Sequence, residues 1–504
     1  MAINRRDFIG CTGGAFASVC TPTKAMDDVR SRGLGKELMR FGALSDIHII
    51  GEASCRPFEK ALRAFDEWKA DGVVACGDLT DWGVVPQLKH VADTWFKVFP
   101  RGRRSDGHPI ANLMHYGDHD TSGYTYRHCK PCVEAYPDEE EVKKIVLGLI
   151  DRKAAWENCF QEEWAPIVKK TVKGFDFILS HFTKGEPTNK AGNNVPGLAE
   201  FLEKAGLDAN RPFFYSQHRV PKNTVGGPFF WGQDDGTSTS DVFSSKYPNC
   251  IALCGHNHLS CTEERAIWQG GFTCVQVPSL SYTTTLAGRE NGMALNDRPF
   301  TDPIPSMSSI RMSGSSKHAL FITVHERAIV ISRRELVNNA SLGPDWVIPF
   351  PVPGSSPYSF ANRAKNEVAP EFPSDAKIKV SCVKGKDRVG KERELYCVEF
   401  PVASSTSTTP RANDYSVSVE VVGDDVVRVY REKRVFSQRY TWDEKADSVF
   451  PVQCCFDRSE VPTGVSCRFT ARPCGSFGAR GKEISTPFQK RTWSLPKPAG
   501  RSNV

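Results

Sequence analysis

Short apolar runs alternate with amphipathic stretches through most of the chain. Five runs have the length of a buried strand, and they cover residues 38–45, 73–76, 110–116, 212–216 and 250–254. After the first run, Phe58, Leu62 and Phe65 recur at helical spacing in a segment that Pro57 opens and Gly72 closes. Strands that alternate with helices in this way indicate an α/β fold.

The remaining pattern adds elements to this first domain. Residues 124–170 combine polar loop with a helix in which Trp156, Phe160 and Trp164 form a core-facing stripe. We also expect a helix at residues 198–205, strands at 175–180, 318–324 and 328–333, and a long insertion loop, rich in Gly, Ser and Pro, at 284–316.

The periodicity changes to two in the last part of the chain. Tyr415, Val417 and Val419 alternate with Ser416 and Ser418, as in strands with one buried face. Because short strands and turn signals follow one another without a helical stretch, we predict a β-sandwich. The chain then divides into an N-terminal signal and linker (1–35), an α/β domain (36–350), a Pro-rich linker (351–375), the β-sandwich (376–488) and a tail (489–504).

Composition and charge narrow the class of protein. The 504 residues hold 65 Lys and Arg against 59 Asp and Glu, a net charge of +6, and no dense basic run forms a nucleic-acid-binding signature. No segment after the N-terminal stretch is long and apolar enough for a membrane span. The chain has 17 cysteines, many for a reducing compartment. Cys129 and Cys132 have no companion Cys-x-x-Cys pair, so we interpret them as structural or free.

The N-terminus carries an export pattern. Arg5 and Arg6 precede Phe8 and a Gly- and Ala-rich stretch at residues 10–19, in which Ala15-Phe16-Ala17 is a candidate cleavage site. This segment resembles a twin-arginine signal. The resemblance implies an exported protein, periplasmic or extracellular, and such a location permits disulfides.

Asp and His residues, whose side chains can bind metal ions, follow directly after each of the five strand-length runs. They are Asp46, His48, Asp78, Asp118, His218, His256 and His258. Because open α/β sheets gather the carboxyl ends of their strands at one edge, we expect these side chains to meet there. Each motif alone is also compatible with a polar turn, but five in order are not. Carboxylate oxygens and imidazole nitrogens suit a pair of catalytic divalent ions.

The order of these motifs resembles that of the calcineurin-like metallophosphoesterase superfamily, over roughly residues 40–350. The matching stretches are Asp46-Ile47-His48, Gly77-Asp78-Leu79-Thr80-Asp81, Gly117-Asp118-His119-Asp120, Gln217-His218 and Gly255-His256-Asn257-His258. The resemblance implies a four-layer α/β/β/α sandwich, to which the C-terminal all-β sandwich is added. Residues 469–487 loosely resemble the last hairpin of a fibronectin type III module.

The resemblance to the superfamily implies a role for each matched residue. The ligands of the first metal would be Asp46, His48, Asp78 and His258, with Asp78 bridging, and those completing the second site would be Asp118, His218 and His256. His119 would protonate the leaving oxygen, oriented by Asp120. The cofactors would be two divalent or trivalent ions such as Mn, Fe or Zn. Asp81 stays open between a support for a metal ligand and a helix N-cap.

Two histidines compete for the position of the lone histidine in this pattern. His181 follows the expected strand at 175–180, and His218 follows that at 212–216. We prefer His218, because a helix, a strand and then His-Arg-Val-Pro is the order in which the family presents this ligand. His181 would then contact substrate or cap its strand.

Asp118 departs from the pattern of the family, which has Asn at this position. An amide oxygen coordinates without charge, and its NH₂ group can meet a phosphate oxygen, whereas a carboxylate adds a negative charge and lacks that donor. We therefore expect Asp118 to bind the second metal more tightly, to repel substrate, and to tune activity without abolishing it.

The resemblance implies hydrolysis of a phosphomonoester or phosphodiester by metal-bound hydroxide, with a phosphate ester as the substrate. A purple acid phosphatase is disfavoured, because its Tyr ligand has no counterpart in this motif, where Asp81 stands. The alternative from another class is a catalytically weak or inactive scaffold protein, in which the β-sandwich binds carbohydrate or protein.

Overall fold

The computed structural model describes most of the chain. It covers residues 33–122, 151–183, 197–208, 211–227, 233–234, 239–284, 289–290, 317–350, 356–386, 392–404, 411–423, 426–437 and 451–492. The predicted twin-arginine segment, Cys129 and Cys132, and nearly all of the predicted insertion loop lie outside the described residues. None of the described helices is long and apolar enough to cross a membrane.

One mixed sheet contains the three N-terminal strands. Its order is β14-β13-β12-β1-β2-β3, and β15 pairs with β13. The strands are β1 (Glu37–Leu44), β2 (Gly72–Cys76), β3 (Ala111–His115), β12 (His318–His325), β13 (Ala328–Glu335), β14 (Ala340–Ser341) and β15 (Trp346–Pro349). β1, β2 and β3 run parallel, so all three end at the same edge of the sheet.

A second mixed sheet lies opposite the first. Its order is β10-β11-β9-β6-β5-β4. The strands are β4 (Ile167–Val172), β5 (Phe175–Ser180), β6 (Phe213–Gln217), β9 (Cys250–Cys254), β10 (Ile267–Gln269) and β11 (Thr273–Gln276). β5, β6, β9 and β11 are parallel to their neighbours in this series, so their carboxyl ends also share one edge.

The two sheets pack face to face through aromatic side chains. Phe41 of β1 meets Phe177 of β5 and Phe214 of β6, with ring centroids 5.2 and 4.7 Å apart. All three side chains are almost fully buried. Successive residues of a strand point to opposite faces, so the neighbours of Phe214 point away from this interface.

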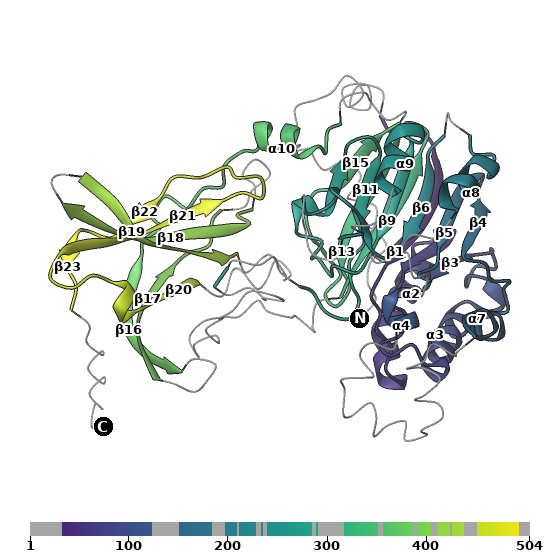
Figure 1. The fold of residues 1–504 in the computed structure, drawn as a ribbon, viewed down its shortest axis with the longest axis horizontal. Helices are drawn as coiled ribbons and strands as arrows, with labels where there is room; N and C mark the ends of the chain where they lie inside the picture. The colour runs from purple at the N-terminus through teal and green to yellow at the C-terminus, as the bar shows by residue number, and fades with distance from the viewer. Residues whose placement is uncertain are drawn as a thin grey trace.

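Helices cover the outer face of each sheet, which completes four layers (Figure 1). On the first sheet, Phe65 of α2 packs against Phe321 of β12, and on the second sheet Phe243 of α9 packs against Tyr215 of β6. The helices of this part are α2 (Cys55–Glu67), α3 (Val85–Val98), α4 (Asp118–Ser122), α7 (Arg152–Phe160), α8 (Leu198–Lys204) and α9 (Thr239–Lys246). The predicted α/β/β/α architecture is confirmed.

The C-terminal part consists of two antiparallel sheets, as the period-two pattern predicts. One has the order β16-β17-β20, and the other β19-β18-β21-β22, with β23 also paired to β21. The strands are β16 (Lys379–Lys386), β17 (Glu392–Phe400), β18 (Asp414–Gly423), β19 (Val426–Phe436), β20 (Val452–Asp457), β21 (Ser466–Cys474), β22 (Ile484–Ser485) and β23 (Gln489–Lys490). Tyr415, Val417 and Val419 all lie in the core between the sheets.

Several elements differ from the sequence-based expectation. β4 falls in the stretch expected to be loop and helix, because an edge strand with one exposed face carries few apolar residues. α10 (Phe360–Asn366), capped by Ser359, occupies part of the expected linker. β23 pairs beyond residue 488, where a tail is predicted to begin. The remaining short elements are β7 (Val220–Pro221), β8 (Gln233–Asp234), η2 (Glu52–Ser54), η3 (Pro100–Gly102), η5 (Glu264–Ala266) and η7 (Arg458–Glu460).

Candidate metal centre

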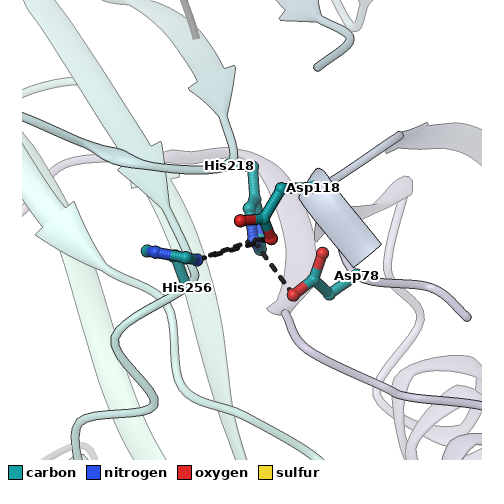
Figure 2. Close-up of side chains that lie close together, drawn as sticks. All are labelled: Asp78, Asp118, His218 and His256. Atoms are coloured by element: carbon teal, nitrogen blue, oxygen red, sulfur yellow. Dashed lines mark hydrogen bonds and ion pairs between the residues drawn. The ribbon is translucent and has the colours of Figure 1, made fainter. Parts of the chain in front are cut away.

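The predicted metal ligands come together at the edge where strands of both sheets end. Asp46 and His48 follow β1, Asp78 follows β2, and Asp118 follows β3. His218 follows β6, and His256 and His258 follow β9 in the opposite sheet. Figure 2 shows Asp78, Asp118, His218 and His256 pointing toward one another. Residues up to 212 positions apart in the sequence thus form one site because both sheets end here.

One cluster consists of Asp46, His48 and His258, all of which are buried. Asp46 Oδ1 lies 3.1 Å from His258 Nε2, and that nitrogen lies 3.3 Å from His48 Nε2. Burial raises the pKa of the Asp46 carboxyl, but the histidines, His258 foremost, outweigh burial and hold the pKa well below its ordinary value. The cluster therefore presents a carboxylate and two imidazoles to one point.

A second cluster consists of Asp78, Asp118, His218 and His256, and a third group, His48, Asp78 and His119, overlaps both. His218 Nε2 lies 3.1 Å from Asp78 Oδ2, 3.2 Å from Asp118 Oδ1 and 3.2 Å from His256 Nδ1. His256 Nδ1 also lies 3.6 Å from Asp118 Oδ1. Four potential ligand atoms converge here, namely two carboxylate oxygens and two imidazole nitrogens.

Asp78 joins the two clusters through a single oxygen. Its Oδ2 atom lies 3.1 Å from His218 Nε2 in one cluster and 3.8 Å from His48 Nε2 in the other. Its Oδ1 atom instead accepts a hydrogen bond from the backbone N–H of His119, 2.9 Å away. That bond fixes the carboxylate with Oδ2 between the clusters, the placement that a bridging ligand requires.

A hydrogen bond at Nδ1 sets the tautomer of three of these histidines. His48 Nδ1 lies 2.9 Å from Asp81 Oδ1. His218 Nδ1 lies 2.7 Å from the Cys76 carbonyl oxygen, and His258 Nδ1 lies 2.9 Å from the Tyr282 carbonyl oxygen. Because each of these oxygens accepts a hydrogen bond, Nδ1 carries the proton, and the neutral ring has its lone pair on Nε2. These Nε2 lone pairs face one another and carboxylate oxygens.

The converging acceptors fit metal ions. Asp118 Oδ1 is buried, yet within the described chain it accepts no hydrogen bond. Although burial lowers the pKa of His218, the carboxylates of Asp78 and Asp118 raise it well above 6.5, so this point favours positive charge. A proton or a metal ion can supply that charge, and a set of carboxylate oxygens and imidazole nitrogens suits Mn, Fe or Zn ions.

The turns that carry the ligands hold strained backbone. Asp46, His48, Asp78, His256 and His258 all have φ between 48° and 72°, the left-handed region. Such residues cost about 1–3 kcal/mol each and cluster where the surroundings hold them for function. Five of the seven predicted ligands share this conformation, which supports a functional purpose for these turns rather than ordinary loop geometry.

Two motif glycines are required by close packing around the ligands. A Cβ atom at Gly117 would lie 2.2 Å from Asp78 Oδ1, and one at Gly255 would lie 1.8 Å from Ser45 Oγ. Any side chain at either position would displace Asp78 or the end of β1. The glycines therefore let the strand ends approach one another closely enough for their ligands to meet.

A family comparison agrees with this geometry. Residues 39–260 match the family described as calcineurin-like phosphoesterase. These residues form a calcineurin-like phosphoesterase domain. The match contains every predicted ligand, from Asp46 to His258.

Comparisons with whole proteins add little to this family match. No curated protein is similar enough in sequence to match. Among solved structures, a dimetal phosphatase from Danio rerio is 10% identical, with 62% of this chain and 100% of that chain covered and a TM-score of 0.37. GAP50, the anchor in the inner membrane complex of Plasmodium, is 10% identical, with 66% and 94% covered and a TM-score of 0.37. Similarities this weak carry no weight for function.

His119, the predicted acid of the phosphoesterase domain, lies beside the first cluster. Its ring meets that of His48 edge to face, with centroids 4.6 Å apart. Its Nδ1 atom donates to the carbonyl oxygen of Asp81 at 2.8 Å. Burial lowers the pKa of His119, but the carboxylates of Asp78 and Asp118 raise it to about 9, so this imidazole holds a proton at neutral pH.

The predicted orientation of His119 by Asp120 needs correction. The Asp120 carboxylate accepts hydrogen bonds from Thr80 Oγ1 at 2.6 Å and from the backbone N–H groups of Gly117, Leu79 and Thr80. Because α4 begins at Asp118, the Asp120 side chain turns inward and ties the β2 and β3 turns together. The group that holds His119 Nδ1 is the Asp81 carbonyl.

The structure also separates the alternatives left open for His181 and Asp81. His181 is buried under Trp156, with ring centroids 4.7 Å apart, and accepts a hydrogen bond from the Tyr116 N–H. It packs in the core, whereas His218 lies in the second cluster. Asp81 supports His48 through the 2.9 Å contact described above, and it caps no helix among the described elements.

Two neighbours of the clusters have no counterpart among the predicted site residues. The ring of Tyr282 stacks on His258, with centroids 4.1 Å apart, and Arg219 Nη2 lies 2.8 Å from Asp118 Oδ2. Tyr282 lies outside every family motif, so the sequence gives no signal for it. Arg219 directly follows His218, and a charged residue beside a metal ligand is the signal that marks it.

Proposed function

We propose that this protein is a dinuclear, metal-dependent phosphoesterase that hydrolyses a phosphomonoester or phosphodiester. The observation that carries this proposal is the pair of carboxylate and imidazole clusters joined by Asp78 Oδ2. A structural site would close each cluster separately, whereas a shared carboxylate oxygen is suited to two ions about 3.5–4 Å apart. The calcineurin-like phosphoesterase family match supports the same reaction class.

Asp46, His48 and His258 would hold one ion, Asp118, His218 and His256 the other, and Asp78 would touch both. Such ions, when bound, supply Lewis acidity to the phosphoryl group and activate water near neutral pH. The chain itself contributes a fixed set of ligands. The hydrogen bonds at the Nδ1 atoms of His48, His218 and His258 keep each Nε2 aimed inward without reorganisation.

His119 is the residue we assign to protonate the leaving oxygen. An alkoxide is a poor leaving group, so its departure needs a proton from a positioned acid. With Nδ1 donating to the Asp81 carbonyl, His119 presents Nε2 for that transfer. His119 lies beside both Asp78 and His48, so its proton is available where the phosphoryl group would bind.

The parts outside the phosphoesterase domain complete the proposal. The Arg5-Arg6 pattern supports export by the twin-arginine route, which carries folded proteins and so allows metal to be loaded beforehand. The strand orders β16-β17-β20 and β19-β18-β21-β22 support a fibronectin type III-like sandwich for the C-terminal part. Such a sandwich would bind carbohydrate or protein.

A substrate screen with controlled metal content tests the function. Purified full-length protein is stripped with a chelator, reloaded with Mn²⁺, Fe²⁺ or Zn²⁺, and assayed on p-nitrophenyl phosphate, bis-p-nitrophenyl phosphate, nucleotides and cyclic nucleotides. We expect hydrolysis that disappears on stripping and returns with metal, and that Asp78→Asn removes. Two bound metals without turnover of any ester would instead favour the scaffold alternative.

A further inference from the structure

Two cysteines of the C-terminal part lie in contact across neighbouring strands. β17 and β20 are antiparallel neighbours (Figure 1), and their register sets Cys397 directly opposite Cys455. The two Sγ atoms lie 2.9 Å apart, and both side chains are almost fully buried. Because 58 positions separate these cysteines in the sequence, only the folded sheet creates the contact.

The alternation of the strands selects Cys455 over the adjacent Cys454. Successive residues of a strand point to opposite faces of the sheet. Val398 and Cys454, which are opposite each other in the register, lie in the core between the two sheets. Cys397 and Cys455 lie in a separate small cluster with Leu395, on the other face of their sheet. The fold therefore directs Cys454 away from the thiol of Cys397.

The backbone geometry of the pair suits a disulfide. Directly opposed residues of antiparallel strands have Cα atoms about 4.5–5.5 Å apart, and a disulfide requires about 4.4–6.8 Å. A bond between the two sulfurs therefore needs no movement of either strand. On the other side of β17, the register sets Ser381 opposite Cys397, so Cys455 is the cysteine that faces Cys397 across a neighbouring strand.

We propose that Cys397 and Cys455 are a disulfide site of the C-terminal sandwich, and that a small-molecule disulfide such as oxidised glutathione is the oxidant. One cysteine thiolate attacks the disulfide of glutathione and releases one glutathione, and the second cysteine attacks the resulting mixed disulfide and releases the other. The Sγ–Sγ bond forms as the bond of the oxidant breaks. Two electrons and two protons pass from the cysteines to the two glutathione thiols.

This disulfide is independent of the proposed phosphoesterase activity, and it accords with the proposed export, because oxidising compartments preserve disulfides. It would join two strands that are 58 positions apart and so restrict the unfolded chain, which stabilises the folded sandwich. β20 is also tied to the other sheet, because Lys433 Nζ of β19 donates to the carbonyl of Cys455 at 3.0 Å.

The bond forms only when the two strands open. The hydrogen bond to Cys397, first, and burial raise the pKa of the Cys455 thiol far above its ordinary value. The folded pair therefore holds its protons and lacks the thiolate that disulfide exchange requires. Oxidation takes place during folding or local unfolding, so a test must let the sandwich open in the presence of the oxidant.

Peptide mapping of the full-length protein tests the site. Reduced protein is kept overnight in urea just below its unfolding midpoint, with reduced and oxidised glutathione, and is returned to buffer without urea. Remaining thiols are then blocked with N-ethylmaleimide in guanidinium, and the protein is digested with trypsin without reduction. Peptide 394–411 carries Cys397, and peptide 446–458 carries Cys454 and Cys455. We expect mass spectrometry to find these two peptides linked.

Two neighbouring substitutions identify the partner of Cys397. Cys455→Ala should lose the link between the two peptides, whereas the matched control Cys454→Ala should keep it. The disulfide should also stabilise the protein, so reductant should lower the thermal unfolding midpoint of the oxidised wild type and of Cys454→Ala by about 10 °C. The midpoint of Cys455→Ala should shift much less.

The inference is overturned if both peptides of the wild type carry the blocking reagent, a result that depends on no variant and therefore on no variant's folding. It is also overturned if Cys454→Ala loses the link or if Cys455→Ala retains it, because the register would then not select Cys455. A linked wild type whose midpoint does not respond to reductant would overturn the stabilising role.

Discussion

At the scale of single residues, the site is built from side chains whose second hydrogen bond fixes their direction. His48, His218 and His258 each give their Nδ1 proton to an oxygen outside the clusters. The cost of orienting the rings is therefore met when the protein folds, before any ion or ester binds. His119 is held in the same way by the Asp81 carbonyl.

Removing the acid at His119 should slow hydrolysis in a way that depends on the leaving group. We expect His119→Asn to lower kcat about 10²- to 10⁴-fold on an alkyl phosphate, because proton transfer to the leaving oxygen is lost. The loss should be much smaller on p-nitrophenyl phosphate, whose phenolate leaves without help. Steady-state kinetics on both esters measures this, with metal content followed in parallel.

The exposed His108 offers a control, and His108→Asn should leave both rates unchanged. Equal losses on the two esters, with metal retained, would mean that His119 does not donate the proton. A loss of metal in His119→Asn would instead make it a ligand.

The convergence of the seven candidate ligands was predictable at this scale because each follows an apolar run in a short motif. Of the groups that orient these histidines, Asp81 was a candidate from the sequence, whereas the carbonyls of Cys76 and Tyr282 were not predictable, because only the fold brings them to His218 and His258. The assignment of Asp120 to His119 failed for a related reason. Adjacency in sequence places both on α4, where their side chains point in different directions.

At the scale of elements, the site depends on how closely β1 packs beneath α2. Gly42 of β1 lies under Phe65 of α2, and a Cβ atom at Gly42 would lie 2.5 Å from three atoms of that ring. Phe65 is fully buried and also packs on Phe321. The position of β1, and so of Asp46 at its end, depends on this contact.

Gly42→Ala should therefore destabilise the domain by about 1–3 kcal/mol, the usual cost of overpacking a core. Denaturant unfolding followed by tryptophan fluorescence measures the change. Gly51→Ala is the matched control, since nothing lies within 4 Å of its Cβ position and its backbone is extended. If both variants unfold at the same denaturant concentration, β1 tolerates the added methyl group and the packing argument is wrong.

Elements with strong apolar patterns were predictable, and weakly patterned ones were not. β2 and β9 are continuous buried runs, whereas the edge strand β4 has one mostly exposed face. α3 has no counterpart among the predicted elements, although Leu88, Val91 and Trp95 recur at helical spacing after Pro86. α10 is short and depends on its tertiary contacts more than on its own sequence.

At the scale of the whole molecule, buried charges connect the two parts. Asp414 of β18 is fully buried and pairs with Arg289 at 2.7 Å and with Arg434 at 2.5 Å. Arg289 follows Tyr282, whose ring stacks on His258, by seven positions in the sequence, and the backbone N–H of Glu290 donates to the Arg434 carbonyl. α10 makes a second connection, because Arg363 pairs with Glu264 and lies over the ring of Phe477.

Asp414→Asn should weaken this connection. Asp414→Asn removes the buried carboxylate that pairs with two guanidinium groups, so we expect a loss of about 3 kcal/mol in the unfolding free energy of the C-terminal sandwich. Calorimetric unfolding of the full-length protein measures it. Asp93→Asn, which removes an exposed pair with Lys89, should change stability by less than about 1 kcal/mol. A loss no larger than that of the control would show that the Asp414 network does not stabilise the sandwich.

The central claim is a dinuclear site that shares Asp78, and a metal titration tests it most directly. Stripped full-length protein is titrated with Mn²⁺ in a calorimeter, and hydrolysis of p-nitrophenyl phosphate is followed at each step. We expect two equivalents to bind, activity to rise with the second, and Asp78→Asn to weaken both binding steps and abolish hydrolysis. A single equivalent with full activity, or hydrolysis by the metal-free protein, would contradict the claim.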